Sequence, residues 1–184
     1  MAGRKKNTGP RDMVISLLVL FVPIIAIYWF FTLDPEPEAE KIEYAPMLAV
    51  AQEESPYPVL HPVNLPEDWV PVRVAWAADG EPWINNEPAV GNSWQLGFMA
   101  PNQIYVAVQQ RDRAPVQFIQ QVTRDGVASG ETVQLAEREW EQWVSEDGRS
   151  RSLVWRDGEL SAVVTGDTDF EQLEAFTATL SGTG

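Results

Sequence analysis

The chain contains no cysteine, one histidine (His61) and very few lysines among its 184 residues. Without cysteine it cannot form disulfides, thiolate metal sites, a cysteine nucleophile or a lipid attachment through cysteine. A Ser-His-Asp triad would have to use His61, which lies directly before Pro62, where a structural role is the commoner one. A zinc site and a Ser-Lys dyad are disfavoured by the same scarcity, because Lys41 is the only lysine beyond residue 6.

Basic side chains are few as well, with 13 Lys and Arg against 27 Asp and Glu and a formal net charge of −14. So acidic a chain repels phosphate backbones, which argues against nucleic acid and anionic lipid head groups as main partners. The motifs G-x-S-x-G and H-E-x-x-H, the P-loop and G-x-G-x-x-G are all absent. The sequence therefore predicts no cofactor, no metal site and no catalytic constellation of a known type.

The longest apolar run covers residues 13–33, which are 21 residues without one ionisable side chain. At about 1.5 Å per helical residue this run spans roughly 30 Å, the thickness of the hydrocarbon core of a bilayer. No small-residue cleavage site follows closely, so we expect an uncleaved membrane anchor rather than a signal peptide. The first 12 residues carry four basic side chains and one acid, which by the positive-inside rule places the N-terminus in the cytoplasm.

Composition divides the chain into five segments, which we expect to differ in structure and location. Alternating Pro and Glu after the apolar run predict an extended, self-repelling spacer. A short helix over 40–54 that docks on the domain is one expectation for the rest of the spacer, and irregular linker is the alternative. The segments are a cytoplasmic basic stub (1–12), a transmembrane helix (13–33), the acidic spacer (34–56), an extracytoplasmic domain (57–180) and a flexible tail (181–184).

Alternation of apolar and polar residues predicts the strands of the domain. The expected strands are 69–76, 93–99, 104–110, 131–144, 150–156 and 159–165. Asp-Gly pairs at 147–148 and 157–158 favour tight hairpin turns between the last three, because Gly and Asp tolerate positive φ.

Two helices are expected within the domain. Asp112 can cap a helix whose first turn holds Pro115, and Thr168 with Glu171 forms a capping box for a final helix that ends near residue 180. The order of elements predicts an α+β fold, with helices on one face of an antiparallel sheet and a single N-terminal transmembrane helix before it.

Several short segments stand along the chain in a particular order and spacing: Arg11-Asp12-Met13, Tyr57-Pro58-Val59-Leu60, Leu65-Pro66-Glu67-Asp68-Trp69, Trp94-Gln95-Leu96-Gly97-Phe98, Asp147-Gly148 and the closing stretch 176–180. Together they resemble the actinobacterial membrane-anchored proteins grouped as domain of unknown function 4245. The resemblance covers nearly the whole chain and implies an envelope protein of a high-GC Gram-positive bacterium. It implies no activity, cofactor or catalytic residue.

Tryptophan in unusual positions supplies the candidate contact residues. Trp83 lies in a Pro/Asn-rich loop, 80–92, where an indole beside amides is suited to hold a glycan or a partner segment. The alternative is that the loop folds back and Trp83 plugs the core. Trp140 and Trp143 cannot both face one side of a regular strand, so a bulge or an exposed indole is expected. The possible ligand or partner contacts are Trp83, Asn85, Asn86, Trp140 and Trp143.

Three classes of function remain open for a single-pass protein of the plasma membrane. The favoured one is a non-catalytic binding or scaffold module of the cell envelope that engages another envelope protein. The second is a lipid- or glycan-binding protein with an apolar cavity or a Trp-lined groove. The third is an acid-pair hydrolase of cell-wall polymers, using Asp79 with Glu81 or Asp167 with Asp169. The same pairs could instead bind Ca²⁺, although such acids more often form turns, caps and solvated surface.

Overall fold

The computed structural model describes residues 10–32 and 41–182, apart from the side chains of 10–12, 30–32 and Asn85. The chain divides into two units, Met1–Glu38 and Ala39–Gly184. The first unit contains helix α1 (Pro10–Thr32), and the expected transmembrane segment runs one residue beyond it. Among the residues described, no helix is both long and apolar enough to cross a bilayer. Most of the expected basic stub, and the start of the spacer, lie outside the described residues.

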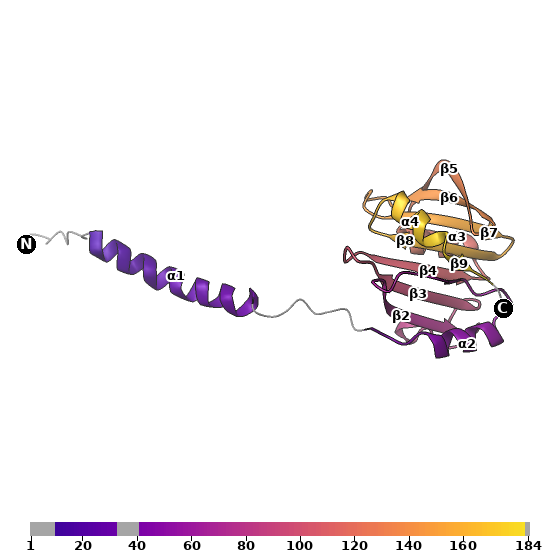
Figure 1. Ribbon diagram of the computed structural model, residues 1–184, viewed down its shortest axis with the longest axis horizontal. Helices are drawn as coiled ribbons and strands as arrows, with labels where there is room; N and C mark the ends of the chain where they lie inside the picture. Colours follow the sequence, from indigo (N-terminus) through magenta and orange to yellow (C-terminus); the bar gives the residue numbers. More distant parts are fainter. Residues whose placement is uncertain (1–9, 33–40, 183–184) are drawn as a thin grey trace, which may run out of the picture. The chain divides into compact units, whose positions relative to one another are not determined.

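The second unit is an α+β domain built on one antiparallel sheet of seven strands (Figure 1). The strand order is β2-β3-β4-β8-β7-β6-β5, with a separate short pair, β1-β9. Its strands are β1 (His61–Pro62), β2 (Val70–Ala77), β3 (Ser93–Met99), β4 (Tyr105–Arg111), β5 (Val127–Leu135), β6 (Arg138–Val144), β7 (Arg151–Asp157), β8 (Leu160–Gly166) and β9 (Leu180–Ser181). Its helices are α2 (Ala45–Glu54), η1 (Ile84–Asn86), α3 (Pro115–Thr123) and α4 (Phe170–Thr177). The expected α+β class and antiparallel sheet are confirmed.

The expected single strand over 131–144 is wrong, because the chain reverses in the middle of it. Ala136 and Glu137 both take positive φ, 48° and 62°, and close a two-residue turn between β5 and β6. Such turns ordinarily use Asn or Gly, since these residues reach positive φ at low cost. The turn therefore carried no sequence signal, and two paired strands looked like one long one.

The principal core lies on the sheet face that α4 covers. Trp94, Leu96 and Phe98 of β3 point to this face at every second position and are at most 2% exposed. Leu173 and Phe176 of α4 pack against them, and Figure 1 shows α4 in front of β7 and β8. The alternation that predicted β3 from the sequence is thus the alternation of a strand with one face in the main core.

The domain begins before residue 57, the boundary that the sequence predicted. Helix α2 lies along β2, with Ala51 fully buried, so the helical alternative for this part of the spacer is confirmed. Ile42 N donates to Pro71 O at 2.9 Å, and Trp76 Nε1 donates to Glu54 Oε2 at 2.7 Å. At the other end Ser181 pairs with His61, so the short β1-β9 pair takes in the first residue of the expected flexible tail.

Helices cover both faces of the sheet, which corrects the expectation of helices on one face. On β8, Val164 points to the α4 side, whereas Val163 packs against Phe118 and Ile119 of α3. Because β8 is central and apolar on both faces, it needs cover on each side. Helix α3 lies mainly over β7 and β8 on its face, and the neighbouring part of that face, over β3 and β4, borders the cleft described below.

Both helix caps differ from those expected. Helix α3 starts after Ala114, which has a φ of 52° and offers no side-chain cap, while the Asp112 carboxylate bonds Asn92 instead. Helix α4 is capped by Asp169, one residue after the expected Thr168, and its carboxylate accepts from Gln172 N at 2.9 Å. The capping chemistry was predicted correctly for α4, but its register was not.

Candidate functional site

A cleft of about 540 Å³ opens on the α3 side of the sheet. Its floor is formed by β3, β4 and the end of β8, and its walls are the loop that carries Trp83 and the C-terminal end of α3. Its volume lies within the range that small-molecule sites occupy. The lining residues are Trp83, Ile84, Glu87, Gln95, Gln103, Ile104, Tyr105, Gln109, Arg111, Gln121, Val122, Arg124, Thr165, Gly166 and Asp167.

The floor is polar because it uses the strand positions that alternate with the core positions. Gln95 Nε2 donates to Tyr105 Oη at 3.3 Å, and burial raises the pKa of Tyr105. The tyrosine ring lies across Gly97, where a Cβ atom would come within 2.1 Å of Tyr105 Oη. Glycine is therefore required at this point of β3 to seat the ring. The amide of Gln109, on β4, has no hydrogen-bond partner in the described part of the chain.

The wall that carries Trp83 is a small, ordered hairpin. Pro82 and Pro88 form an antiparallel bridge, and Trp83 N donates to Glu87 O at 2.8 Å around η1. The Trp83 side chain is half-buried, and the described residues give its indole N–H no hydrogen-bond partner. The loop is thus a preformed wall that presents a partly exposed indole to the cleft.

The base of this hairpin is held by charged and amide groups. Asp79 accepts from Gly91 N at 2.8 Å and pairs with Arg113 at 2.8 Å. Asn92 donates its backbone N–H and its side-chain amide to the two oxygens of Asp112, at 2.7 and 2.6 Å. Asp79, which we considered as half of a catalytic acid pair, is therefore occupied in fixing the loop.

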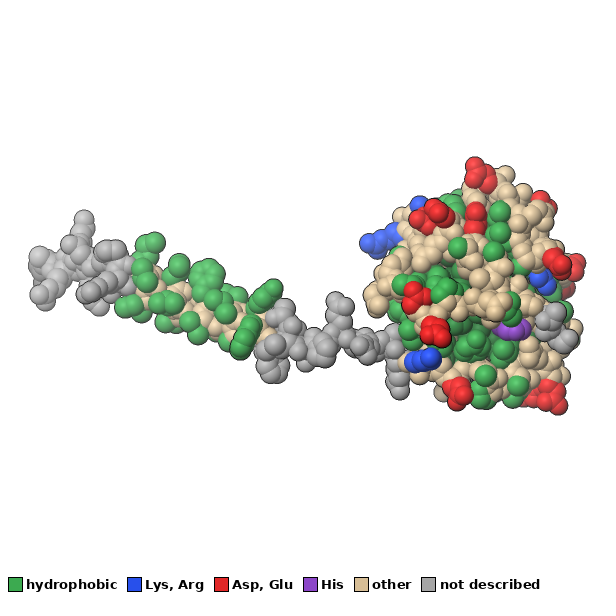
Figure 2. All heavy atoms as spheres, in the orientation of Figure 1, with side chains coloured by type: hydrophobic (Ala, Val, Ile, Leu, Met, Phe, Trp, Pro, Cys, Tyr) green, Lys and Arg blue, Asp and Glu red, His purple; other side chains and the backbone are tan. Residues whose placement is uncertain are grey.

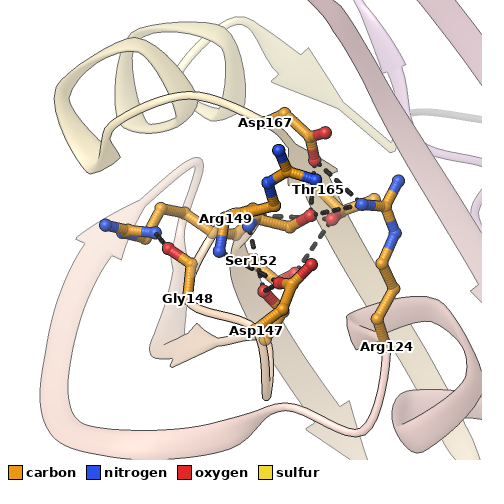
Figure 3. Close-up of polar contacts among 10 residues, drawn as sticks. Arg124, Asp147, Gly148, Arg149, Ser152, Thr165 and Asp167 are labelled. Atoms are coloured by element: carbon orange, nitrogen blue, oxygen red, sulfur yellow. Dashed lines mark hydrogen bonds and ion pairs between the residues drawn. The ribbon is translucent and has the colours of Figure 1, made fainter.

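The opposite wall rests on a polar network beyond the end of α3 (Figure 3). Arg124 Nη1 donates to Ser150 Oγ at 2.9 Å and pairs with Asp167 at 3.2 Å, while Ser150 Oγ also donates to Asp167. Beside them Ser152 Oγ donates to Thr165 Oγ1 at 2.9 Å. Asp167 and Asp169 form the second acid pair that we considered for a hydrolase. Asp167 is paired with Arg124, and Asp169 caps α4.

The Asp-Gly turn between β6 and β7 adjoins this network, as Figure 3 shows. Asp147 accepts from Ser145 Oγ at 2.6 Å and from Arg149 N at 3.0 Å. The Ser145 bond first, and the Arg149 N–H next, hold the pKa of Asp147 below its usual value. The turn is thereby fixed close to the cleft, and Asp147 remains ionised at neutral pH.

Arg111 is the unusual charge of the site. It is only 9% exposed, and burial lowers the pKa of its guanidinium. Its Nε donates to Ser93 Oγ at 3.2 Å, and its Cζ lies 4.8 Å from the centre of the Phe118 ring. Among the described residues no carboxylate lies within 4.0 Å of it. Burying a charge without an opposite charge beside it costs free energy of folding, and the packing of the domain does not account for this cost at Arg111.

The residues singled out from the sequence are placed very differently. Trp83 lines the cleft, whereas Asn86 is exposed and lies outside the lining, and the side chain of Asn85 is outside the described part of the structure. Trp140 is fully buried and donates from Nε1 to Leu135 O at 3.1 Å. This burial corrects the expectation that Trp140 contacts a ligand or partner.

The placement of Trp143 shows how β6 holds two tryptophans three residues apart without fully exposing either indole. It points to the face opposite Trp140, is half-buried and packs against the α3 cluster. It also lines a second, smaller hollow of about 290 Å³ between α3 and β5, together with Val116 and Ile119. Because α3 covers this face, both indoles of β6 have something to pack against.

Most residues of the cleft had no sequence signal. Gln95, Gln109 and Arg111 occupy the polar positions of alternating strands, where a sheet covered on one face would put them in water. The Trp83 loop and the position of α3 on the second face together turn this polar row into a cleft. The acidic side chains are spread over the domain surface in Figure 2, and in the described ranges no three His, Asp or Glu residues lie together as a metal site would require.

The chain matches, over residues 5–180, the family described as protein of unknown function, DUF4245. Since the match covers nearly the whole sequence, the chain belongs to this family, and the resemblance of its segments to domain of unknown function 4245 is confirmed. A search of curated proteins finds no match.

Proposed function

We propose that this protein is a single-pass, membrane-anchored and extracytoplasmic binding module of the cell envelope, which binds its ligand in the cleft between Trp83 and α3. The observation that carries the proposal is the cleft itself. It is of ligand size, its two walls are held by hydrogen-bond networks, and its lining includes the amide of Gln109, which has no hydrogen-bond partner among the described residues. Preformed sites of this kind, with a few convergent polar groups, are how proteins hold small molecules.

The anchor is argued from residues 13–33. Helix α1 includes all but the last of them, and each described side chain from 13 to 29 is exposed. Figure 2 shows hydrophobic side chains along the visible length of this helix. A helix that is apolar on every side has no face suited to water and is stable in lipid. The basic residues before it and the acidic chain after it favour an N-terminus in the cytoplasm.

A non-catalytic role fits the chemistry of the cleft better than hydrolysis does. Its lining contains neither histidine nor lysine, and of its two carboxylates Asp167 is bonded to Arg124 and Ser150. The other, Glu87, is exposed on the loop. An acid-pair mechanism needs one carboxyl group kept protonated by burial and a second within reach of the same bond. Neither requirement is met by a paired acid and an exposed one.

A scaffold that binds an envelope protein through another surface is the second candidate function. The hollow beside Trp143 supports it, because Val116 and Val127, which line this hollow, are each 67% exposed. Exposed valines beside a hollow of this kind are typical of sites where proteins meet. This candidate differs from the cleft proposal in the surface used, so one pair of variants separates them.

The test is native mass spectrometry of the full-length protein, extracted with a mild detergent from its own membrane. Gln109→Trp fills the cleft from a half-buried position, and Gln134→Trp makes the same change at an exposed site on β5. We expect added mass on the wild type and on Gln134→Trp, and its loss on Gln109→Trp. A bare wild-type protein would contradict the proposal. A bound protein that survives Gln109→Trp would instead support the scaffold.

A further inference from the structure

We infer that the ligand of this cleft is an acidic sugar, whose carboxylate or phosphate is bound by Arg111 and whose ring lies against Trp83. This inference rests on the proposed function, because it specifies the ligand of the same cleft. It begins from Arg111, a buried charged group that has no carboxylate within 4.0 Å among the described residues.

The guanidinium of Arg111 has donors to spare. Only its Nε–H has a hydrogen-bond partner among the described residues, Ser93 Oγ, and one face of the group is occupied by the Phe118 ring. The planar fork of arginine has five N–H donors and is matched to the two oxygens of a carboxylate or phosphate. A ligand anion would therefore supply the opposite charge that the fold withholds from a side chain that is 9% exposed.

The other charges of the cleft leave Arg111 available for this role. Arg124 is already paired with Asp167 at 3.2 Å, and the carboxylate of Glu87 is exposed on the loop and lies beyond 4.0 Å from any arginine of the described chain. The chain carries a formal net charge of −14, so the field of the whole molecule repels anions from a distance. A single anionic group held at short range by a bidentate arginine is compatible with this charge, whereas a polyanion is not.

The rest of the lining fits a sugar ring better than an apolar ligand. The half-buried indole of Trp83 offers an apolar face that the C–H groups of a pyranose can cover. Gln109 offers an amide with both donor and acceptor groups, which suits the hydroxyl groups of a sugar. A lipid chain would leave this amide without a partner, at a cost in binding free energy.

The inference is tested by calorimetric titration of the full-length protein in neutral detergent micelles with glucuronate, glucose 1-phosphate and glucose. We expect at least one acidic probe to bind at least about tenfold more tightly than glucose, which corresponds to about 1.4 kcal/mol. The stronger of the two acidic probes identifies the anion as carboxylate or phosphate. Equal binding of all three, or binding of glucose alone, would overturn the inference.

Arginine variants test whether Arg111 is the group that binds the anion. Arg111→Gln should lower the affinity for the acidic probe about tenfold or more, to the affinity for glucose. The affinity of Arg111→Lys should lie between those of the wild type and Arg111→Gln, because lysine keeps the charge but not the planar set of donors. Arg156→Gln removes the same charge from an exposed site and should leave binding unchanged. If Arg111→Gln fails to fold, Arg111→Lys and the wild-type preference for acidic probes still decide the question.

The outcome separates this inference from the function on which it rests. If the native protein carries a ligand that Gln109→Trp removes, but no acidic probe binds, the ligand class is wrong and the cleft still has a ligand. If the native protein is bare and no probe binds, both proposals fail.

Discussion

The contact between Gly97 and Tyr105 gives the sharpest test of how the cleft floor is built. A Cβ atom added at Gly97 would lie 2.1 Å from Oη, 2.5 Å from Cζ and 2.6 Å from Cε2 of Tyr105. Ordinary carbon contacts need about 3.5 Å, so Gly97→Ala must displace the ring by about 1 Å or more. Overpacking of this kind costs about 1–3 kcal/mol of the free energy of unfolding.

The same substitution should be harmless once the ring is gone. In a Tyr105→Ala background, Gly97→Ala should be neutral or stabilise by about 0.5–1 kcal/mol, because alanine restricts the unfolded chain more than glycine does. The two substitutions are therefore expected to couple by at least about 1 kcal/mol, within the range measured for contacting residues.

The assay is urea unfolding of the fragment 39–184, followed by tryptophan fluorescence and extrapolated linearly to water. This fragment keeps α2, which the fold makes part of the domain. Equal m-values are expected for the four proteins, since the chain exposes the same surface. If Gly97→Ala costs nothing alone, or if the two changes add within about 0.5 kcal/mol, the ring does not lie across Gly97 as described.

Further predictions concern the core, an orphan hydroxyl and pH. Trp94→Ala should cost about 3–5 kcal/mol of the free energy of unfolding, because the indole is fully buried and donates to Leu60 O. Trp83→Ala should change this free energy by less than about 1 kcal/mol in urea unfolding and should abolish binding in calorimetry. Similar losses of stability in the two variants would contradict this prediction. Ser161→Ala should be neutral or stabilise by about 1 kcal/mol, since Ser161 Oγ is buried without a partner in the described chain, and a clear loss in urea unfolding would reveal a missed bond. Burial raises the pKa of Tyr57, and the charge of Asp112 raises it further. The stability that neutral tyrosine contributes is therefore complete below about pH 10 and declines above it. A Tyr57→Phe domain should lose less stability between about pH 9 and 11 than the wild type, and equal losses would argue against this account.

Much of the fold was accessible from the sequence because its strands carry their own signals. Strand β3 begins and ends where alternation placed it, and β2 and β4 differ by one residue at each end. The hairpin at Ala136 and Glu137 was missed, because its positive φ values fall on residues that rarely adopt them. The alternation of residues thus predicted the strands, whereas a turn that lacks the usual Asn or Gly could not be predicted from its residues.

The candidate site was accessible only in part, because it depends on a tertiary arrangement. Trp83 could be singled out as an indole in a polar loop, and the structure places it on the wall of the cleft. Gln109 and Arg111 look like ordinary solvent-facing strand residues until α3 is known to lie on the same face. Trp140 shows the converse, since a second covered face gives each indole of β6 a place to pack. Sequence periodicity reports that a face is polar and not whether it is enclosed.

The measurement that tests the account most directly follows the tryptophan indole N–H signals of the fragment 39–184 by NMR during titration with the stronger acidic probe. The signal of Trp83 should move in a saturable way, and those of Trp94 and Trp140, which are fully buried, should stay in place. With Arg111→Gln the Trp83 shift should disappear at the same probe concentration. Saturable shifts at Trp143 alone, or none at Trp83 while the probe binds, would contradict the claim that the ligand lies between Trp83 and Arg111.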